Sequence, residues 1–145
     1  MNKLNRIDEA VACFNEGFNC SQAIFSTYCG EFGLDKKTAL QIACGFGAGM
    51  GRMQGNCGAV SGAYMLIGLK YGKFLKGDDD AREKTYALVR EFARQFEELN
   101  GTTNCREILG VDLINGDKQA TIEHVKLTCP KIVRDAAEII ESILF

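Results

Sequence analysis

Hydrophobic side chains recur at helical spacing along almost the whole chain. Apolar residues stand three or four positions apart, which is typical of helices that bury one face. Glycine, asparagine and aspartate residues stop or cap these runs. Together the signals predict helices at about 7–16, 20–32, 36–44, 58–71, 78–99, 116–128 and 130–144, with a short helical turn at 105–109. No stretch shows the alternation of apolar and polar residues that predicts a strand.

The segment 58–71 differs from the other predicted helices because it is apolar on nearly every side. A helix of this kind is typically buried in the centre of a bundle, and it would also suit an interface in a homo-oligomer. We therefore expect an all-α fold, a compact bundle of about six or seven helices around this buried central helix. No repeat or change in composition marks a boundary, so residues 1–145 are expected to form a single domain.

A glycine-rich stretch, from Gly45 to Gly58, precedes the central helix and contains six glycines among fourteen residues. This glycine content is incompatible with a stable helix interior and predicts a loop. A loop just before a helix lets the backbone approach a ligand and point N–H groups at negative charge. The pattern GxxxxGK[ST] of phosphate-binding loops is absent, so the stretch is not a Walker motif.

Composition and charge exclude several classes of protein. The chain has 145 residues, of which 46% are hydrophobic and 25% charged, and its net charge is −2. These values are ordinary for a globular protein and provide no general positive field for nucleic acid or an anionic membrane. The N-terminal residues show no secretory signal, and the weakly polar run 59–69 is too short to span a bilayer. We expect a cytoplasmic protein that binds neither nucleic acid nor membranes.

The cysteine content is high for a chain of this size. The seven cysteines are Cys13, Cys20, Cys29, Cys44, Cys57, Cys105 and Cys129. In a reducing compartment, cysteines more often bind metals or carry redox chemistry than form structural disulfides. No CxxC pair occurs, so any shared site must be assembled by the fold. The single histidine, His124, excludes a metal site built from several histidines.

Four of the cysteines stand where a helix is predicted to begin. Cys20, Cys57 and Cys105 each follow an asparagine, and Cys129 is followed by Pro130. Asparagine is a common N-cap, and proline is favoured at the first helical position. Free N–H groups and the positive dipole end of a helix favour a thiolate, which is more reactive and a better metal ligand. The other three cysteines are expected to be small buried side chains.

Four thiolates that meet at one point suit an iron–sulfur cluster or a tetrahedral zinc ion. Without a metal, the same thiols could cycle between dithiol and disulfide. The residues alone leave three interpretations open: a redox site with an iron–sulfur cluster or other metal, metal-free thiol–disulfide chemistry, and structural zinc.

Four blocks of the sequence occur in a distinctive order: GFNCSQAIF, CGFGAGMGRMQGNCGAVSGA, NCREILGVD and CPKIVRDAAEII. Together they resemble the bacterial C_GCAxxG_C_C family of redox-active proteins, whose hallmark is four cysteines and a CGAxxG motif. The motif corresponds to residues 57–62. The resemblance implies that the cofactor or metal is bound by Cys20, Cys57, Cys105 and Cys129, with Gly58 beside it.

The resemblance also implies an iron–sulfur cluster or another bound prosthetic group. Members of the family are often encoded near oxidoreductases or transporters, so a role in electron transfer, or as an accessory to such a protein, is expected. A protein redox partner follows from that role. The resemblance implies no particular reaction, and any enzymatic activity would be linked to an oxidoreductase.

Overall fold

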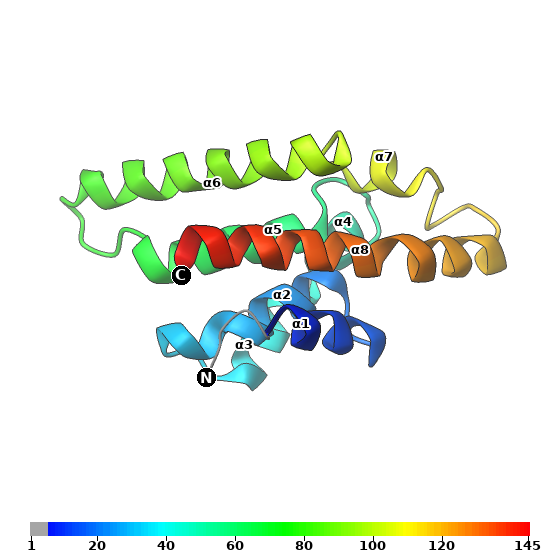
Figure 1. The fold of residues 1–145 in the computed structure, drawn as a ribbon, viewed down its shortest axis with the longest axis horizontal. Coiled ribbons are helices and arrows are strands. Elements are labelled where there is room, and N and C mark those ends of the chain that lie inside the picture. Colours follow the sequence, from blue (N-terminus) through cyan, green and yellow to red (C-terminus); the bar gives the residue numbers. More distant parts are fainter. Residues whose placement is uncertain (1–5) are drawn as a thin grey trace.

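A computed structural model describes residues 6–145, which form an all-α bundle (Figure 1). The helices are α1 (Arg6–Asn15), α2 (Cys20–Tyr28), α3 (Lys36–Cys44), α4 (Gly47–Met50), α5 (Gly58–Tyr71), α6 (Asp79–Asn100), α7 (Cys105–Leu109) and α8 (Lys118–Leu144). A 3-10 turn, η2 (Cys29–Phe32), continues α2. Extended pairing within the described residues is confined to one isolated bridge between Asn56 and Asn104. The predicted fold class is therefore confirmed.

The centre of the bundle is α5, which packs against α2, α6 and α8. In Figure 1, α6 and α8 run lengthwise in opposite directions, and α1, α2 and α3 lie together on the other side of α8. Ala59, Val60, Ala63, Leu66 and Ile67 of α5 are fully buried. The prediction of a buried central helix over 58–71 is correct. Within residues 6–145, the helices are all too short or too polar to cross a bilayer.

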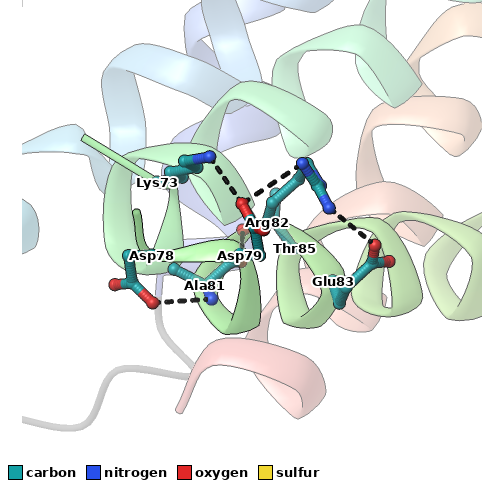
Figure 2. A network of polar contacts seen from close by, with 7 residues as sticks. All are labelled: Lys73, Asp78, Asp79, Ala81, Arg82, Glu83 and Thr85. Carbon is teal, nitrogen blue, oxygen red and sulfur yellow. Dashed lines mark hydrogen bonds and ion pairs between the residues drawn. The ribbon is translucent and has the colours of Figure 1, made fainter. Parts of the chain in front are cut away.

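The acidic run at the start of α6 ends the preceding linker as the sequence predicts. The Asp78 carboxylate accepts a hydrogen bond from the Ala81 N–H at 3.2 Å, which caps the helix. Figure 2 shows the Asp79 carboxylate between Lys73, at 2.7 Å, and Arg82, at 3.4 Å. Negative charge in the first turn also interacts favourably with the helix dipole. This network anchors one end of α6 to the linker that follows α5.

The C-terminal part of the chain differs from the prediction. Instead of two helices, at 116–128 and 130–144, it forms one continuous helix, α8, that begins after the N-cap Asp117 and contains Pro130. Proline removes one helical hydrogen bond, but its fixed backbone angle is compatible with a helix. The helix packs against α7 as well as α1, α2, α5 and α6, and this tertiary packing outweighs the local stop signal.

The two helices α2 and α5 approach each other closely because α5 carries a glycine at their contact. A Cβ atom added at Gly62 would lie 2.9 Å from the Ser21 carbonyl oxygen and 3.2 Å from Ile24 Cβ. The first of these contacts is with backbone, which cannot rotate away. Gly68, on the same helix, has open space where its Cβ would be.

We therefore expect opposite effects from two substitutions on α5. Gly62→Ala forces α2 and α5 apart and should lower the free energy of unfolding by ~1–3 kcal/mol. Gly68→Ala, the matched control, should raise it by ~0.5–1 kcal/mol because alanine is the better helix former. Urea unfolding of both variants measures the two changes. Equal effects of the two substitutions would contradict the close contact at Gly62.

Candidate functional site

Four cysteines that are far apart in the sequence line one cavity of about 100 Å³. They are Cys20, Cys57, Cys105 and Cys129, and Gly58 borders the same cavity. Most of the remaining wall is apolar and includes Phe14, Ile108, Leu109, Leu113, Val125 and Ile132. No charged side chain is among the described residues that line it. The fold thus brings together the four sulfur atoms that the sequence singled out.

Cys20 is the first residue of α2, as predicted. The Asn19 side chain caps the helix by accepting a hydrogen bond from the Gln22 N–H at 2.9 Å. The Asn19 amide also donates to the Cys44 carbonyl at 2.9 Å, which attaches the start of α2 to the end of α3. These bonds hold the Cys20 sulfur at the edge of the cavity.

Cys57 and Cys105 are placed by two Asn-Cys segments that run antiparallel to each other. Asn56 and Asn104 form the isolated bridge, the Cys57 N–H donates to the Thr103 carbonyl at 2.7 Å, and the Cys105 N–H donates to the Gly55 carbonyl at 2.7 Å. Asn104 also caps α7, as predicted, by accepting from the Glu107 N–H. Asn56 is not a cap, because its amide donates to the Ser61 hydroxyl and Cys57 itself occupies the N-cap position of α5.

The prediction for Cys129 was wrong in one respect. Cys129 lines the cavity, but it lies in the middle of α8 and not at a helix start. The local sequence, Thr-Cys-Pro, is compatible with a helix start, but packing on both sides of Pro130 keeps the helix continuous. Only three of the four sulfur atoms therefore stand at helix N-termini.

The glycine-rich loop contains a turn of left-handed backbone. Residues 48 to 52 all have positive φ, between 55° and 70°, and three of them, Ala48, Met50 and Arg52, are not glycine. Left-handed backbone costs such residues about 1–2 kcal/mol each. The turn directs the Ala48 N–H at the Cys20 sulfur. A loop was predicted here; the structure places the short helical turn α4 within it, and the left-handed backbone begins at Ala48 of α4.

The motif glycine Gly58 leaves room for the Cys20 sulfur. A Cβ atom at this position would lie 2.6 Å from Cys20 Sγ and 2.9 Å from the Phe46 carbonyl oxygen. Any side chain would therefore push the sulfur away from the start of α5. Gly58 was expected beside the cofactor, and in the structure its direct neighbour is a thiol.

Cys20 is the thiol that most readily ionises. A hydrogen bond from the Cys57 thiol lowers the Cys20 pKa to about 7, and backbone N–H groups of Ser21, Ala48 and Ala59 also donate to the Cys20 sulfur. These donors outweigh the opposing effect of burial. The lowered pKa favours the thiolate of Cys20, and the thiolate is the nucleophilic form of cysteine.

The other three thiols of the cavity do not follow the expectation that helix starts favour thiolate. Donation to Cys20, together with burial, raises the pKa of Cys57. Burial and the nearby Cys20 charge raise the pKa of Cys105 to about 11. Burial and the charges of Cys20 and Cys105 raise the pKa of Cys129 to about 12. The apolar surroundings, which the sequence argument omitted, disfavour further negative charge.

The remaining cysteines lie outside the cavity. Cys13 and Cys29 are buried, as expected for small apolar side chains. Cys13 contacts the Ser26 hydroxyl, and Cys29 contacts the Ser26 carbonyl. Burial raises the pKa of both thiols. Cys44 is exposed at the end of α3, so the expectation that it is buried was wrong. His124 is also exposed, and its Nδ1 contacts the Ala120 carbonyl one turn earlier in α8.

Gln54 is a residue of the site that the sequence did not reveal. It is 5% exposed, its side-chain amide bonds to the backbone of Val111 and Leu113, and it opposes the rise that burial causes in the Cys105 pKa. A glutamine in a loop carries no recognisable local signal. The density of glycines around it was the one indication that this backbone lies close to something else.

The sulfur atoms of the four cavity cysteines are spread around the cavity wall and are not gathered in one compact group. Among residues 6–145, no three His, Cys, Asp or Glu side chains lie close enough together to hold one metal ion. The Cys57 thiol lowers the pKa of Cys20, and the Cys20 thiolate in turn raises the pKa of Cys105 and of Cys129.

The structure is thus an all-helical bundle in which four cysteine side chains line one cavity. A sequence model of the C_GCAxxG_C_C family, described as "putative redox-active protein", matches residues 18–143. The chain therefore belongs to this family. Comparisons with curated proteins and with solved structures gave no match.

The unusual pKa of Cys20 leads to a prediction about its reactivity. Because only the thiolate is nucleophilic, alkylation of Cys20 should reach half its maximal rate at about pH 7 and slow as the pH falls further. Cys57→Ala removes the principal hydrogen bond and should move this midpoint upward, whereas Cys29→Ala should not. Peptide-resolved mass spectrometry after iodoacetamide pulses measures the rate. A wild-type midpoint near 9.0, the ordinary cysteine value, would contradict the arrangement.

Proposed function

We propose that the four thiols of the cavity are the ligands of an iron–sulfur cluster, and that the protein acts in electron transfer with a protein partner or as an accessory to an oxidoreductase or transporter. The observation that carries this proposal is the single cavity bordered by Cys20, Cys57, Cys105 and Cys129. Such a cluster, when bound, supplies one-electron redox chemistry.

The chemistry of the donor set supports this choice. The described lining offers four sulfur ligands and no carboxylate or imidazole, which is the ligand set of iron–sulfur clusters. A zinc ion also accepts four thiolates, but it requires sulfur atoms about 3.8 Å apart around one point, given Zn–S bonds of about 2.3 Å. An iron–sulfur cluster, by contrast, distributes its four thiolate ligands over more than one iron ion.

The backbone around the cavity supports the same proposal. The N–H groups of Ser21, Ala48 and Ala59 are directed at the Cys20 sulfur, and those of Ala59 and Val60 at the Cys57 sulfur. Hydrogen bonds to sulfur stabilise negative charge and set the reduction potential of such centres. Cys129 is only half-buried, which leaves one side of the cavity near the surface for exchange of electrons with a partner.

Anaerobic reconstitution with iron and sulfide tests the proposal. We expect the wild-type protein to retain iron and sulfide and to show visible charge-transfer absorbance. Serine substitution of any one of the four cavity cysteines should remove most of the bound iron. Cys13→Ser, Cys29→Ser and Cys44→Ser are the matched controls and should retain it. A reconstituted protein without iron, or freshly isolated protein with one zinc per chain, would overturn the proposal.

A second candidate function is metal-free thiol–disulfide exchange, and the direct contact of Cys20 with Cys57 favours it. The Cys20 thiolate would attack a disulfide substrate and form a mixed disulfide, releasing one thiol. The Cys57 sulfur, after losing its proton, would then attack Cys20 and release the second thiol. The substrate disulfide is reduced, and Cys20 and Cys57 are oxidised to a disulfide.

Oxidised glutathione provides the test of this second candidate. Reduced, metal-free protein should form a disulfide between Cys20 and Cys57, identified by mass spectrometry of unreduced tryptic peptides. Cys57→Ser should instead accumulate glutathione on Cys20, and Cys20→Ser should react much more slowly. An unchanged thiol count in the wild-type protein after this treatment would exclude the exchange.

A further inference from the structure

A second cavity, of about 390 Å³, shares no described lining residue with the cavity of the four cysteines. We call it the charged cleft, and its lining includes Arg6, Glu9, Ser26, Glu31 and Lys36. We propose that the charged cleft binds a small zwitterion, a molecule of the amino acid or short peptide class that carries one ammonium and one carboxylate group. The proposal does not depend on the function proposed for the four cysteines.

The charged cleft lies between α1, the corner where α2 passes into η2, and the start of α3. Helices α1 and α3 each pack against α2, and the three lie together on one side of the bundle (Figure 1). The cleft is therefore built on regular elements of the fold, which hold its walls in place. Its volume lies within the range of about 300–1,000 Å³ that is typical of pockets for small molecules.

Two positive and two negative side chains stand around the charged cleft. Arg6 and Glu9 are one helical turn apart on α1. Glu31 belongs to η2, and Lys36 is the first residue of α3. Arg6 and Glu31 form an ion pair that joins α1 to η2. No hydrogen bond or ion pair connects the side chain of Glu9 or Lys36 to another described residue, so the cleft offers one free carboxylate and one free ammonium group.

The least exposed residues that line the charged cleft are small. Ser26 is 6% exposed and Cys29 1% exposed, and the next residue, Gly30, has no side chain. These residues leave room for a ligand below the charged side chains. The contact that the Ser26 hydroxyl makes with the Cys13 sulfur is long, at 3.8 Å. Because a hydroxyl has one donor and two acceptor positions, Ser26 can form further hydrogen bonds.

The balance of charge decides the class of ligand. The charges of the four side chains cancel, so an anion or a cation alone would pair with one free group of the cleft and leave the opposite group unpaired. A zwitterion pairs with both: its ammonium group donates to the Glu9 carboxylate, and its carboxylate accepts from the Lys36 ammonium group. The ion pair between Arg6 and Glu31 is already neutral and leaves these two groups to the ligand.

Four matched probes test the proposal on the full-length protein as isolated. Glycylglycine carries both charges, N-acetylglycine only the carboxylate, glycinamide only the ammonium group, and N-acetylglycinamide neither. NMR titration of isotope-labelled protein measures their binding. We expect glycylglycine to shift the amide signals of Gly30 and Leu34 saturably and to bind about fivefold more tightly than either singly charged probe. N-acetylglycinamide should give no saturable shift.

Two charge-removing variants should show opposite preferences. Glu9→Gln should weaken the binding of glycylglycine and glycinamide about fivefold and leave that of N-acetylglycine unchanged. Lys36→Gln should weaken glycylglycine and N-acetylglycine and leave glycinamide unchanged. Glu16→Gln and Lys37→Gln are the matched controls, because both residues are exposed and lie outside the described lining of the cleft. All four substitutions are at exposed positions, where the fold tolerates change.

Several outcomes would overturn the proposal. One is the absence of a saturable shift with glycylglycine at concentrations up to about 10 mM. Another is equal affinity for glycylglycine and a singly charged probe, which would indicate attraction to one charge only. Equal losses in Lys36→Gln and Lys37→Gln would indicate a general effect of surface charge. Failure of the protein to take up iron would remove the proposed function of the four cysteines and leave this result unaffected.

Discussion

The contact between the start of α2 and the start of α5 is the constraint on which the cavity depends. Two glycines of the CGAxxG motif make this contact possible: Gly58 admits the Cys20 sulfur, and Gly62 admits the Ser21 carbonyl. With the helices this close, N–H groups at the start of α5 reach two sulfur atoms, those of Cys20 and Cys57. The motif thus has a physical explanation in which the cysteine provides the sulfur and the glycines provide the space.

Burial and charge act against each other inside this cavity. Helix N-termini and the left-handed turn stabilise one thiolate, on Cys20, but the apolar wall makes each additional negative charge more costly. The described lining contains no lysine, arginine or histidine to offset such charge. Ionisation of all four sulfur atoms together therefore requires positive charge from outside the protein, and metal ions are the usual source of it.

The sequence predicted the features that depend on local signals. The helix caps at Asn19 and Asn104 were predictable from the sequence because a cap bonds to residues only a few positions away. The apolar character of 58–71 likewise identified the central helix. The four cysteines singled out in the sequence line one cavity, although the helix start expected at Cys129 was wrong.

Features set by distant contacts were not predictable in the same way. Packing against several helices keeps α8 continuous through Pro130, and no pattern near the proline reports those contacts. The left-handed turn could be inferred only as a loop, because glycine permits this backbone without requiring it. Gln54 acts through segments more than fifty residues further along the chain, at Val111 and Leu113, so its neighbours in sequence give no indication of its role.

The order of the four sulfur atoms along the chain has a consequence for how the protein is made. The wall formed by Val125, Cys129 and Ile132 belongs to α8, which leaves the ribosome after the helices that carry the other three cysteines. Until it emerges, the cavity around the other three thiols lacks one of its walls. Any group that needs all four thiols can consequently be completed only after Cys129 has been synthesised.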